Sequence, residues 1–462
     1  MGDVAIPAAP PLPAALSLTD DRPTRVRYWV VGLGTLMAVV LYLDRFCLSI
    51  TLDDIKKDLG LSDEQKDWLL SAFFLTYALG QVPAGWLSDR YGARAMLSLY
   101  VLLWSLFTGL VGLADSFIVL LFLRFGIGLA QAGAYPTGAS MVGKWVPFTA
   151  RGLASAMVST GGRIGGVAAP VLTAFLMAEA LRLSQTVDHS LARIDGVAWR
   201  SVMLLYGGAG VVVAWLIWRV VRNRPREHPG CNDAELRLIE EGSPPPAGKP
   251  GALPIRYILT SRSLWLSSLS QIGTNFGWVF ILNSLPSYLL NVHNVALRQR
   301  GVMGMLPILV GLFGMLFGGW LTDRLTQLFG VRWGRRAPMA LTRFSAMAGF
   351  LLCIPLSDSA WGVTFALCLV ALSTDLGTAS IWAFMQDVGG KHVGSVLGWG
   401  NMWGNLGAAI SPLVLGYVLK SYNQNWDMVF LACSGAFLLS GLAALGVDAT
   451  IPVVPPEKAS ES

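Results

Sequence analysis

The chain has 462 residues, of which 54% are hydrophobic and only 13% are charged, and its formal net charge is +6 at pH 7. Soluble domains carry about 25% charged residues, so this composition excludes a soluble enzyme with one anchor and predicts a polytopic membrane protein. The basic residues cluster in short loops, as membrane orientation requires, and nucleic-acid binding is a poor explanation for the charge. The five cysteines show no CxxC or Cys/His spacing, so we expect neither a disulfide framework nor a zinc site.

The apolar stretches predict twelve membrane spans, because a spanning helix needs about 20 apolar residues. The first residues are rich in Pro and Ala and lack a signal-peptide pattern, so we expect a disordered cytoplasmic tail at 1–27. In chain order, the predicted spans run approximately over 28–50, 68–87, 95–114, 117–142, 153–178, 201–221, 264–285, 303–321, 339–355, 361–385, 394–418 and 429–447.

A long polar interruption between the sixth and seventh spans contains the run Pro244-Pro245-Pro246 and indicates a linker. Lys and Arg concentrate in alternate loops, and this predicts that the linker and both termini are cytoplasmic. The predicted domains are a bundle at 28–222, a linker at 223–262, a bundle at 263–447 and a cytoplasmic tail at 448–462.

A six-residue motif occurs after the second span and again after the eighth. Gly-Trp-Leu-Ser-Asp-Arg occupies 85–90, and Gly-Trp-Leu-Thr-Asp-Arg occupies 319–324. This repetition indicates a duplicated bundle whose halves move against each other. An Asp at the end of one helix could cap the start of another helix or pair with an Arg, and such contacts would lock one state and break in the other. The predicted gating residues are Gly85, Asp89, Arg90, Gly92, Arg94, Asp323 and Arg324.

Ionisable side chains interrupt several apolar spans. Asp44 and Arg45 lie in the first span, Arg124 opens the fourth, Arg163 lies in the fifth and Asp375 in the tenth. Each charge at mid-bilayer depth costs about 2.5–3.5 kcal/mol. We interpret these residues as lining a polar path for a charged solute, and the arginines point to an anion.

The loop from Gly85 to Arg94 reads Gly-x-Leu-x-Asp-Arg-x-Gly-x-Arg and resembles the most recognisable motif of the major facilitator superfamily. Within it, the chain looks like the anion:cation symporter group, which contains bacterial hexuronate, galactonate and glucarate permeases and animal vesicular glutamate and sodium/phosphate-type carriers. The supporting pieces include Tyr42-Leu43-Asp44-Arg45, Arg124 with Gly126, Gly128 and Pro136, and Asn401 with Gly404 and Asn405.

This resemblance covers nearly the whole chain. It implies an all-α membrane protein with twelve transmembrane helices in two pseudo-symmetric six-helix bundles. It also implies a multi-pass protein of a bacterial inner membrane, and we expect a monomer in the lipid bilayer.

Arg45 is the first candidate for binding an anion. A guanidinium never deprotonates, and it can hold a carboxylate or phosphate through two parallel hydrogen bonds. The resembled group has an Arg at this place that contacts its anionic substrate. The alternative is a structural ion pair, for which neighbouring Asp44 is a poor partner because adjacent helical residues point about 100 degrees apart. Asp44 itself could accept a proton or could only hold two helices together.

Polar and aromatic side chains inside the spans could line a central cavity. Tyr42 lies three residues before Arg45, so both project from one side of the helix, and Tyr77 lies in the second span. Both tyrosines could donate a hydroxyl to a sugar acid or could serve only in packing. Trp382 could stack on a sugar-like substrate or act as an interfacial anchor, and Asn401 is a further candidate for contacting substrate.

Position 131 departs from the resembled group. That group has a Glu seven residues after the Arg of the fourth span, and it titrates during proton coupling; this chain has Gln131, which cannot release a proton. Gln131 could still hydrogen-bond substrate. We hypothesise that Arg163 and Asp375 form a charge pair across the halves that opens to take substrate or a proton. The alternative is a static buried pair, or Asp375 bonded to a neighbouring Ser or Thr.

The sequence contains no nucleotide-binding loop and no catalytic nucleophile or metal motif, so we expect no enzyme activity and no cofactor. The predicted function is secondary active transport of a small organic anion, such as a sugar acid or another carboxylate, by alternating access with H⁺ or Na⁺ symport. Anion exchange, uncoupled facilitation and a phosphate-ester substrate are the alternatives.

Overall fold

The computed structural model describes residues 22–187, 197–241 and 255–454. The tails predicted at 1–27 and 448–462 therefore lie largely outside the described residues, and so does the run Pro244-Pro245-Pro246. The first half contains α1 (Val26–Leu59), α2 (Asp63–Tyr91), α3 (Ala93–Val111), α4 (Phe117–Ala132), α5 (Ala134–Trp145), η1 (Phe148–Ala150), α6 (Arg151–Val187) and α7 (Val197–Val220).

The second half contains α10 (Arg262–Val279), η4 (Phe280–Ser284), α11 (Leu285–Asn291), α12 (Leu297–Cys353), α13 (Ala360–Leu376), α14 (Thr378–Gly389), η5 (Gly390–His392), α15 (Val393–Ser421) and α16 (Trp426–Leu445). Between the halves lie η3 (Pro225–Glu227), α8 (Asp233–Glu240) and α9 (Ile255–Thr260). The linker thus contains helices that the sequence reading did not predict.

In the described residues, eight helical stretches are long and apolar enough to cross a membrane. Two of them, 302–353 and 360–421, each hold two spans, because the chain reverses at Gly330 (φ +75°) and near Gly390 (φ +52°). Together with α2 and the broken helix α10–α11, they make up twelve spans. This confirms the predicted all-α fold with two six-helix bundles.

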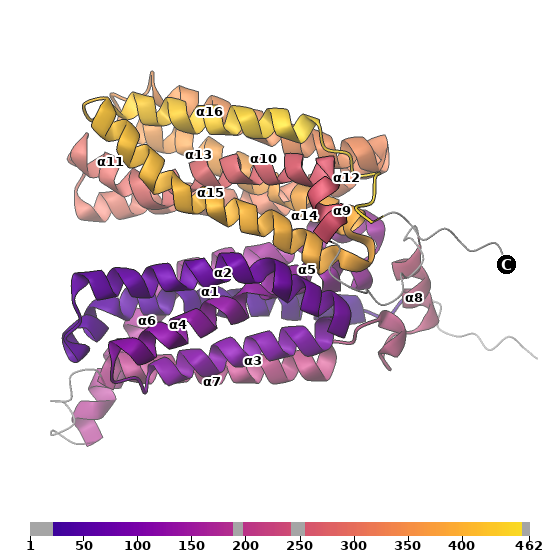
Figure 1. The fold of residues 1–462 in the computed structure, drawn as a ribbon, viewed down its shortest axis with the longest axis horizontal. Helices are drawn as coiled ribbons and strands as arrows, with labels where there is room; N and C mark the ends of the chain where they lie inside the picture. Colours follow the sequence, from indigo (N-terminus) through magenta and orange to yellow (C-terminus); the bar gives the residue numbers. More distant parts are fainter. Residues whose placement is uncertain (1–21, 188–196, 242–254, 455–462) are drawn as a thin grey trace, which may run out of the picture.

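Figure 1 shows the two bundles side by side, with α8 outside them at one end of the long axis. We call this the linker end. Because α1 starts there beside α8 and successive spans alternate in direction, Asp89 near the end of α2 and Asp323 in α12 lie at the same end. An apolar core of the first half extends at this end onto α14 and α15, through side chains such as Phe384 and Val396, whereas a second core lies within the other half.

Local signals explain where several helices begin and end. α1 stops at Gly60, whose left-handed backbone (φ +63°) lets its N–H bond to the carbonyl of Lys56. α2 starts with a capping box: the Ser62 hydroxyl accepts from the Gln65 amide, and the Gln65 side chain accepts from the Ser62 amide. On the outer faces, large apolar side chains such as Phe122 and Phe313 are each 70% exposed, which suits a protein whose surrounding solvent is lipid.

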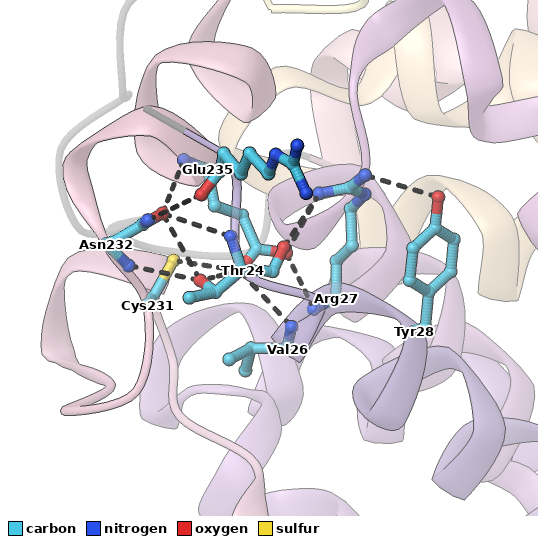
Figure 2. Close-up of polar contacts among 8 residues, drawn as sticks. Thr24, Val26, Arg27, Tyr28, Cys231, Asn232 and Glu235 are labelled. Atoms are coloured by element: carbon cyan, nitrogen blue, oxygen red, sulfur yellow. Dashed lines mark hydrogen bonds and ion pairs between the residues drawn. The ribbon is translucent and has the colours of Figure 1, made fainter. Parts of the chain in front are cut away.

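Glu235 of α8 attaches the linker to the start of α1 (Figure 2). Its carboxylate accepts hydrogen bonds from the backbone N–H groups of Val26 (3.2 Å) and Arg27 (3.1 Å) and from the Thr24 hydroxyl (2.5 Å), and it pairs with the Arg27 guanidinium at 3.0 Å. The first N–H groups of a helix have no partner within it, and negative charge there is favourable. A residue more than 200 positions away thus caps the first membrane helix.

Candidate functional site

Arg45 lies in α1 with its charge uncompensated by any carboxylate of the described residues. Its Nε and Nη2 both donate to Oε1 of Gln131, at 3.4 and 3.3 Å. The guanidinium carbon is 4.4 Å from the ring centroid of Tyr77, 5.0 Å from that of Phe73 and 5.1 Å from that of Tyr42. The positive group is therefore held by three aromatic rings and one amide, an arrangement that stabilises a cation without neutralising it.

We call the three aromatic rings around Arg45 its cage. Two further charged residues lie near it: Arg124 contacts the ring of Phe73, and Asp44 is the neighbour of Arg45 in the sequence. Arg124 in α4 is 2% exposed; its Nε donates to the carbonyl of Leu69 at 3.0 Å, and its guanidinium carbon is 4.8 Å from the ring centroid of Phe73. Asp44 is 3% exposed, and neither of its carboxylate oxygens has a hydrogen-bond partner in the described part of the chain. Asp44 does not pair with Arg45, as expected for adjacent positions of a helix.

A second arginine is neutralised by a carboxylate of the opposite bundle. Nη2 of Arg163 in α6 donates to Oδ1 of Asp375 in α13 at 2.5 Å. The guanidinium carbon lies 4.2 Å from the ring centroid of Trp278 in α10. Asp375 is 1% exposed, and its Oδ2 has no hydrogen-bond partner in the part of the chain that the structure describes. Gly311 of α12 makes room for this oxygen, which a side chain at that position would strike.

An aromatic chain joins the two arginines. The ring centroid of Tyr135 in α5 is 6.5 Å from that of Tyr42 and 5.4 Å from that of Trp382 in α14. Both tyrosines pack on Gly162, where an added Cβ would lie 2.5 Å from the Tyr135 hydroxyl and 2.8 Å from the Tyr42 ring. Because Gly162 precedes Arg163, the cage of Arg45 and the pair of Arg163 border the same tyrosines. Trp382 thus meets this cluster from the second half.

Asn401 is not brought into this cluster by any contact of the described residues. It is half-buried in α15, and its backbone carbonyl accepts a hydrogen bond from the side chain of Asn405 at 2.8 Å. Its side chain has no recorded hydrogen bond, ion pair or ring contact with the arginines or tyrosines.

At the linker end, Asp89 caps a helix of the opposite bundle. Its two carboxylate oxygens accept from the backbone N–H groups of Gly394 and Ser395 and from the Ser395 hydroxyl, each at 2.8 Å. These residues begin α15, where a negative charge is favourable. Gly85, one turn earlier, permits this close approach, because a Cβ there would strike the carbonyl of Gly394.

Asp323 makes the matching contact from the second half to the first. Its oxygens accept from the backbone N–H groups of Gly152 and Leu153, both at 2.9 Å, at the start of α6. Gly319, like Gly85, permits the close approach of the two bundles, because a Cβ at this position would lie 3.0 Å from the carbonyl oxygen of Gly152.

An ionic network surrounds Asp323, whereas Asp89 has no ion pair within 4 Å among the described residues and interacts with the charge of Lys144 from farther away. Arg335 is fully buried, 3.8 Å from Asp323 and 2.8 Å from Asp387 of α14. Asp387 also lies 3.5 Å from Arg151 of the first half. Next to it, the Gln386 side chain donates to the carbonyl of Ala139 at 3.3 Å, which is a further bond between the halves.

The other residues of the two motifs remain within their own bundle. Arg90 lies over the rings of Trp86 and Tyr91 and is exposed. Gly92 takes a positive φ of +92° between α2 and α3, and Arg94 donates to the carbonyl of Trp218 at 2.9 Å. Arg324 is exposed. The structure therefore places Asp89 and Asp323, but not these three arginines, at the interface of the halves.

Several contributing residues were missed by sequence reasoning. Phe73 lies four residues before Tyr77, on the same helical face, so the Tyr77 prediction could have indicated it. Tyr135 and Trp278 give no signal of this kind, because aromatic residues are common in apolar spans. Arg335 belongs to a basic run with Arg332 and Arg336, and sequence alone does not distinguish the buried member.

Comparisons with known proteins agree with this architecture. A family model described as the Major Facilitator Superfamily matches residues 34–412. A Bacillus subtilis protein named "Probable galactarate/D-glucarate transporter GudP" is 31% identical and covers 92% of this chain and 93% of its own length. A Cupriavidus necator protein named "Probable sulfoacetate transporter SauU" is 30% identical over 95% of this chain and 97% of its own length.

The crystal structure of the Escherichia coli fucose:proton symporter FucP has a TM-score of 0.70 with this chain at 16% identity, covering 91% of this chain and 98% of that one. This likeness shows the fold. The two bundles and the matching contacts of Asp89 and Asp323 between them fit a membrane transporter built from two halves. The chain belongs to the Major Facilitator Superfamily, and the resemblance to its anion:cation symporter group is confirmed by the relatives.

Proposed function

We propose that the protein carries a small organic anion across the membrane by alternating access and binds it at Arg45. The observation that carries this proposal is a guanidinium inside the bundle that is caged by aromatic rings and has no carboxylate partner among the described residues. In a low-dielectric cavity, an anion is the partner such a group lacks, and an Arg–carboxylate contact is roughly twice as strong as a neutral hydrogen bond.

The charges of the spans support an anionic solute. Four arginines of the spans, Arg45, Arg124, Arg163 and Arg343, are buried or half-buried, whereas Asp44 and Asp375 are the two buried carboxylates among them. Two positive charges are therefore in excess. Binding an anion with one or two negative charges would reduce this excess.

The aromatic lining supports a hydroxylated solute. The hydroxyls of Tyr42, Tyr77 and Tyr135 can each donate or accept a hydrogen bond, and Trp382 offers an apolar ring face. Sugar acids carry a carboxylate and several hydroxyls, so they match both the cation and this lining. The relatives named for galactarate, D-glucarate and sulfoacetate support the same class of organic anions.

The linker end is cytoplasmic in this proposal, as are both termini, and the protein resides in a bacterial inner membrane as a monomer. The contacts of Asp89 and Asp323 across the halves hold the linker end closed, so the described conformation would admit solute from outside. Symport with H⁺ or Na⁺ drives uptake; the runner-up mechanisms are exchange and uncoupled facilitation.

Counterflow in proteoliposomes tests the proposal directly. Vesicles preloaded with D-glucarate, D-glucuronate or sulfoacetate are diluted into the same labelled solute, and only a carrier shows transient accumulation. Arg45→Gln should weaken binding by about 10- to 150-fold, because a hydrogen bond to a charged group contributes about 1.5–3 kcal/mol. Arg45→Lys keeps the charge but loses the paired geometry, so its loss should be smaller.

Arg182→Gln is the matched control, because Arg182 is an exposed arginine of the same half whose side chain is 77% accessible. It should behave as the wild type does. Transport by Arg45→Gln at the wild-type level for every solute would reject the proposal.

A further inference from the structure

The tenth span repeats the break of the fourth span. α4 ends at Ala132 and α5 resumes after Gly133, whose φ and ψ are −81° and −13°. α13 ends at Leu376 and α14 resumes after Gly377, whose φ and ψ are −78° and −11°. The fourth span of each half is thus interrupted at a glycine of nearly identical backbone geometry.

Gln131 and Asp375 occupy the same place relative to these breaks, two residues before the glycine. Gln131 is fully buried and accepts from Arg45; Asp375 is 1% exposed and accepts from Arg163. The two halves therefore build the same unit, an oxygen acceptor held by an arginine, with one chemical difference. The first half has an amide, which cannot bind or release a proton, and the second half has a carboxylate, which can.

The two units also differ in whether their arginine and their acceptor lie in the same bundle or in opposite bundles. Arg45 and Gln131 lie in one bundle, so movement of the bundles does not separate them. Arg163 and Asp375 lie in opposite bundles, α6 and α13, so rocking of one bundle against the other must stretch or break their contact. Separating a buried ion pair leaves two uncompensated charges, each with a penalty of several kcal/mol, and protonating the carboxylate removes one of them.

The surroundings leave Arg163 as the charged group that faces Asp375. From α12, Gly311 contacts Asp375 and carries no titratable group. Arg343, also from α12, lies against Gly377 and has no ion pair to Asp375 in the described residues.

The neighbours of Arg163 are aromatic. From α10, Trp278 stacks on its guanidinium. The other groups near Arg163 are the hydroxyls of Tyr42 and Tyr135. Oδ2 of Asp375 is buried and has no hydrogen-bond partner among the described residues, so it has a free position for a proton.

We propose that Asp375 carries the coupled proton, taking it from the outer solution as Arg163 is released and returning it to the cytoplasm before the linker end closes and the pair re-forms. This inference rests on the proposed function, because it assigns the coupling step of that transport. The proton adds to the carboxylate to give a neutral acid, and its departure restores the anion, so charge and atoms balance over the cycle.

The test compares counterflow with accumulation driven by a pH gradient, using whichever of D-glucarate, D-glucuronate or sulfoacetate gives the strongest counterflow. Counterflow needs only binding and movement, whereas accumulation needs the coupled proton. Asp375→Asn should keep counterflow and lose accumulation above the equilibrium level. Asp375→Glu should restore accumulation, and Asp358→Asn, the same change at an exposed aspartate, should leave both unchanged.

Asp375→Asn leaves Arg163 buried without an anion, so the protein could fail to fold. The double variant Arg163→Gln/Asp375→Asn removes both charges and therefore that penalty, and it should also show counterflow without accumulation. Accumulation of solute by either variant under a pH gradient overturns the assignment of Asp375. So does wild-type accumulation that follows a Na⁺ gradient at equal pH. Absence of wild-type counterflow for all three solutes contradicts the proposed function instead.

Discussion

The two copies of the Gly-Trp-Leu motif make the same backbone contact in different charge environments. Asp89 and Asp323 each cap the first helix turn of a span in the opposite bundle, and a glycine one turn earlier, Gly85 or Gly319, makes the approach possible. Duplication has therefore preserved the cap and the close packing. These two features depend on backbone atoms, which every sequence supplies.

The charges around the two caps differ. Asp323 lies in a buried network with Arg335 and Asp387 that reaches Arg151 in the other bundle, whereas Asp89 has no ion pair within 4 Å among the described residues. The second contact is therefore expected to resist opening more strongly, because its ion pairs are close, whereas the charge of Lys144 acts on Asp89 from beyond 4 Å. Pseudo-symmetry in the fold does not imply equal strength of the two contacts between the bundles.

The largest expected effect comes from Arg335→Gln, which removes the centre of this network. Taking one partner from a buried ion pair costs about 3–5 kcal/mol, and here Asp323 loses its cation while Asp387 keeps only Arg151 of its two described arginine partners. The population should shift from a closed to an open linker end. Maleimide labelling of Ala139→Cys, which is fully buried at this interface, in a background without the native cysteines, measures the shift. Labelling as slow as in the parent protein would count against the network.

Gly85→Ala and Gly319→Ala should each open the linker end by a smaller amount. The added methyl groups would meet the carbonyls of Gly394 and Gly152, and overpacking of this kind costs about 1–3 kcal/mol. Gly85→Ala should be the more severe, because the approach is closer there. The same labelling assay checks the order, and Gly416→Ala, where the added methyl meets open space, is the control.

Asp89→Asn and Asp323→Asn separate the cap from the network. Asp89→Asn loses the attraction between a charge and a helix start, which reaches about 2 kcal/mol in partly buried positions. Asp323→Asn loses this attraction and its interaction with Arg335, so it should increase labelling more. Equal labelling of the two variants would show that Arg335 acts through Asp387 alone.

The smallest effects are expected for Arg90→Gln and Arg324→Gln. Both arginines are exposed and have no hydrogen bond or ion pair with the other bundle among the described residues, and surface substitutions usually change stability by no more than about 0.5 kcal/mol. Labelling and thermal unfolding in detergent should match the parent protein. A large increase in labelling for either variant would mean that the motif arginines have a role in closing the gate that the described contacts do not contain.

The twelve spans and the duplication could be predicted from the sequence, because hydropathy and a repeat that differs at one of six positions are local signals. The charges at Arg45, Arg163 and Asp375 stand out for the same reason, since each interrupts an apolar span. The cage of Arg45 could be predicted only in part: Tyr42 follows from helical spacing, while Phe73 and Tyr135 resemble ordinary packing residues.

Partners far apart in the chain could not be predicted with the same success. Arg335 and Asp387 are separated by 52 positions, and Asp89 bonds to residues 305 and 306 positions away. A loop with several basic residues does not reveal which one becomes buried, because burial depends on the docking of the other bundle. Glu235 likewise appears as one acid among several in a polar linker.

The attachment of Glu235 to the start of α1 has a practical consequence for watching this protein move. Because α8 is fastened to the first bundle, a fluorophore on α8 would travel with that bundle as though placed on the membrane helices themselves. A second fluorophore on α9, which adjoins α10, would report on the other bundle. Each movement of one bundle relative to the other would then change the efficiency of energy transfer between the two fluorophores. Both fluorophores would lie outside the membrane spans.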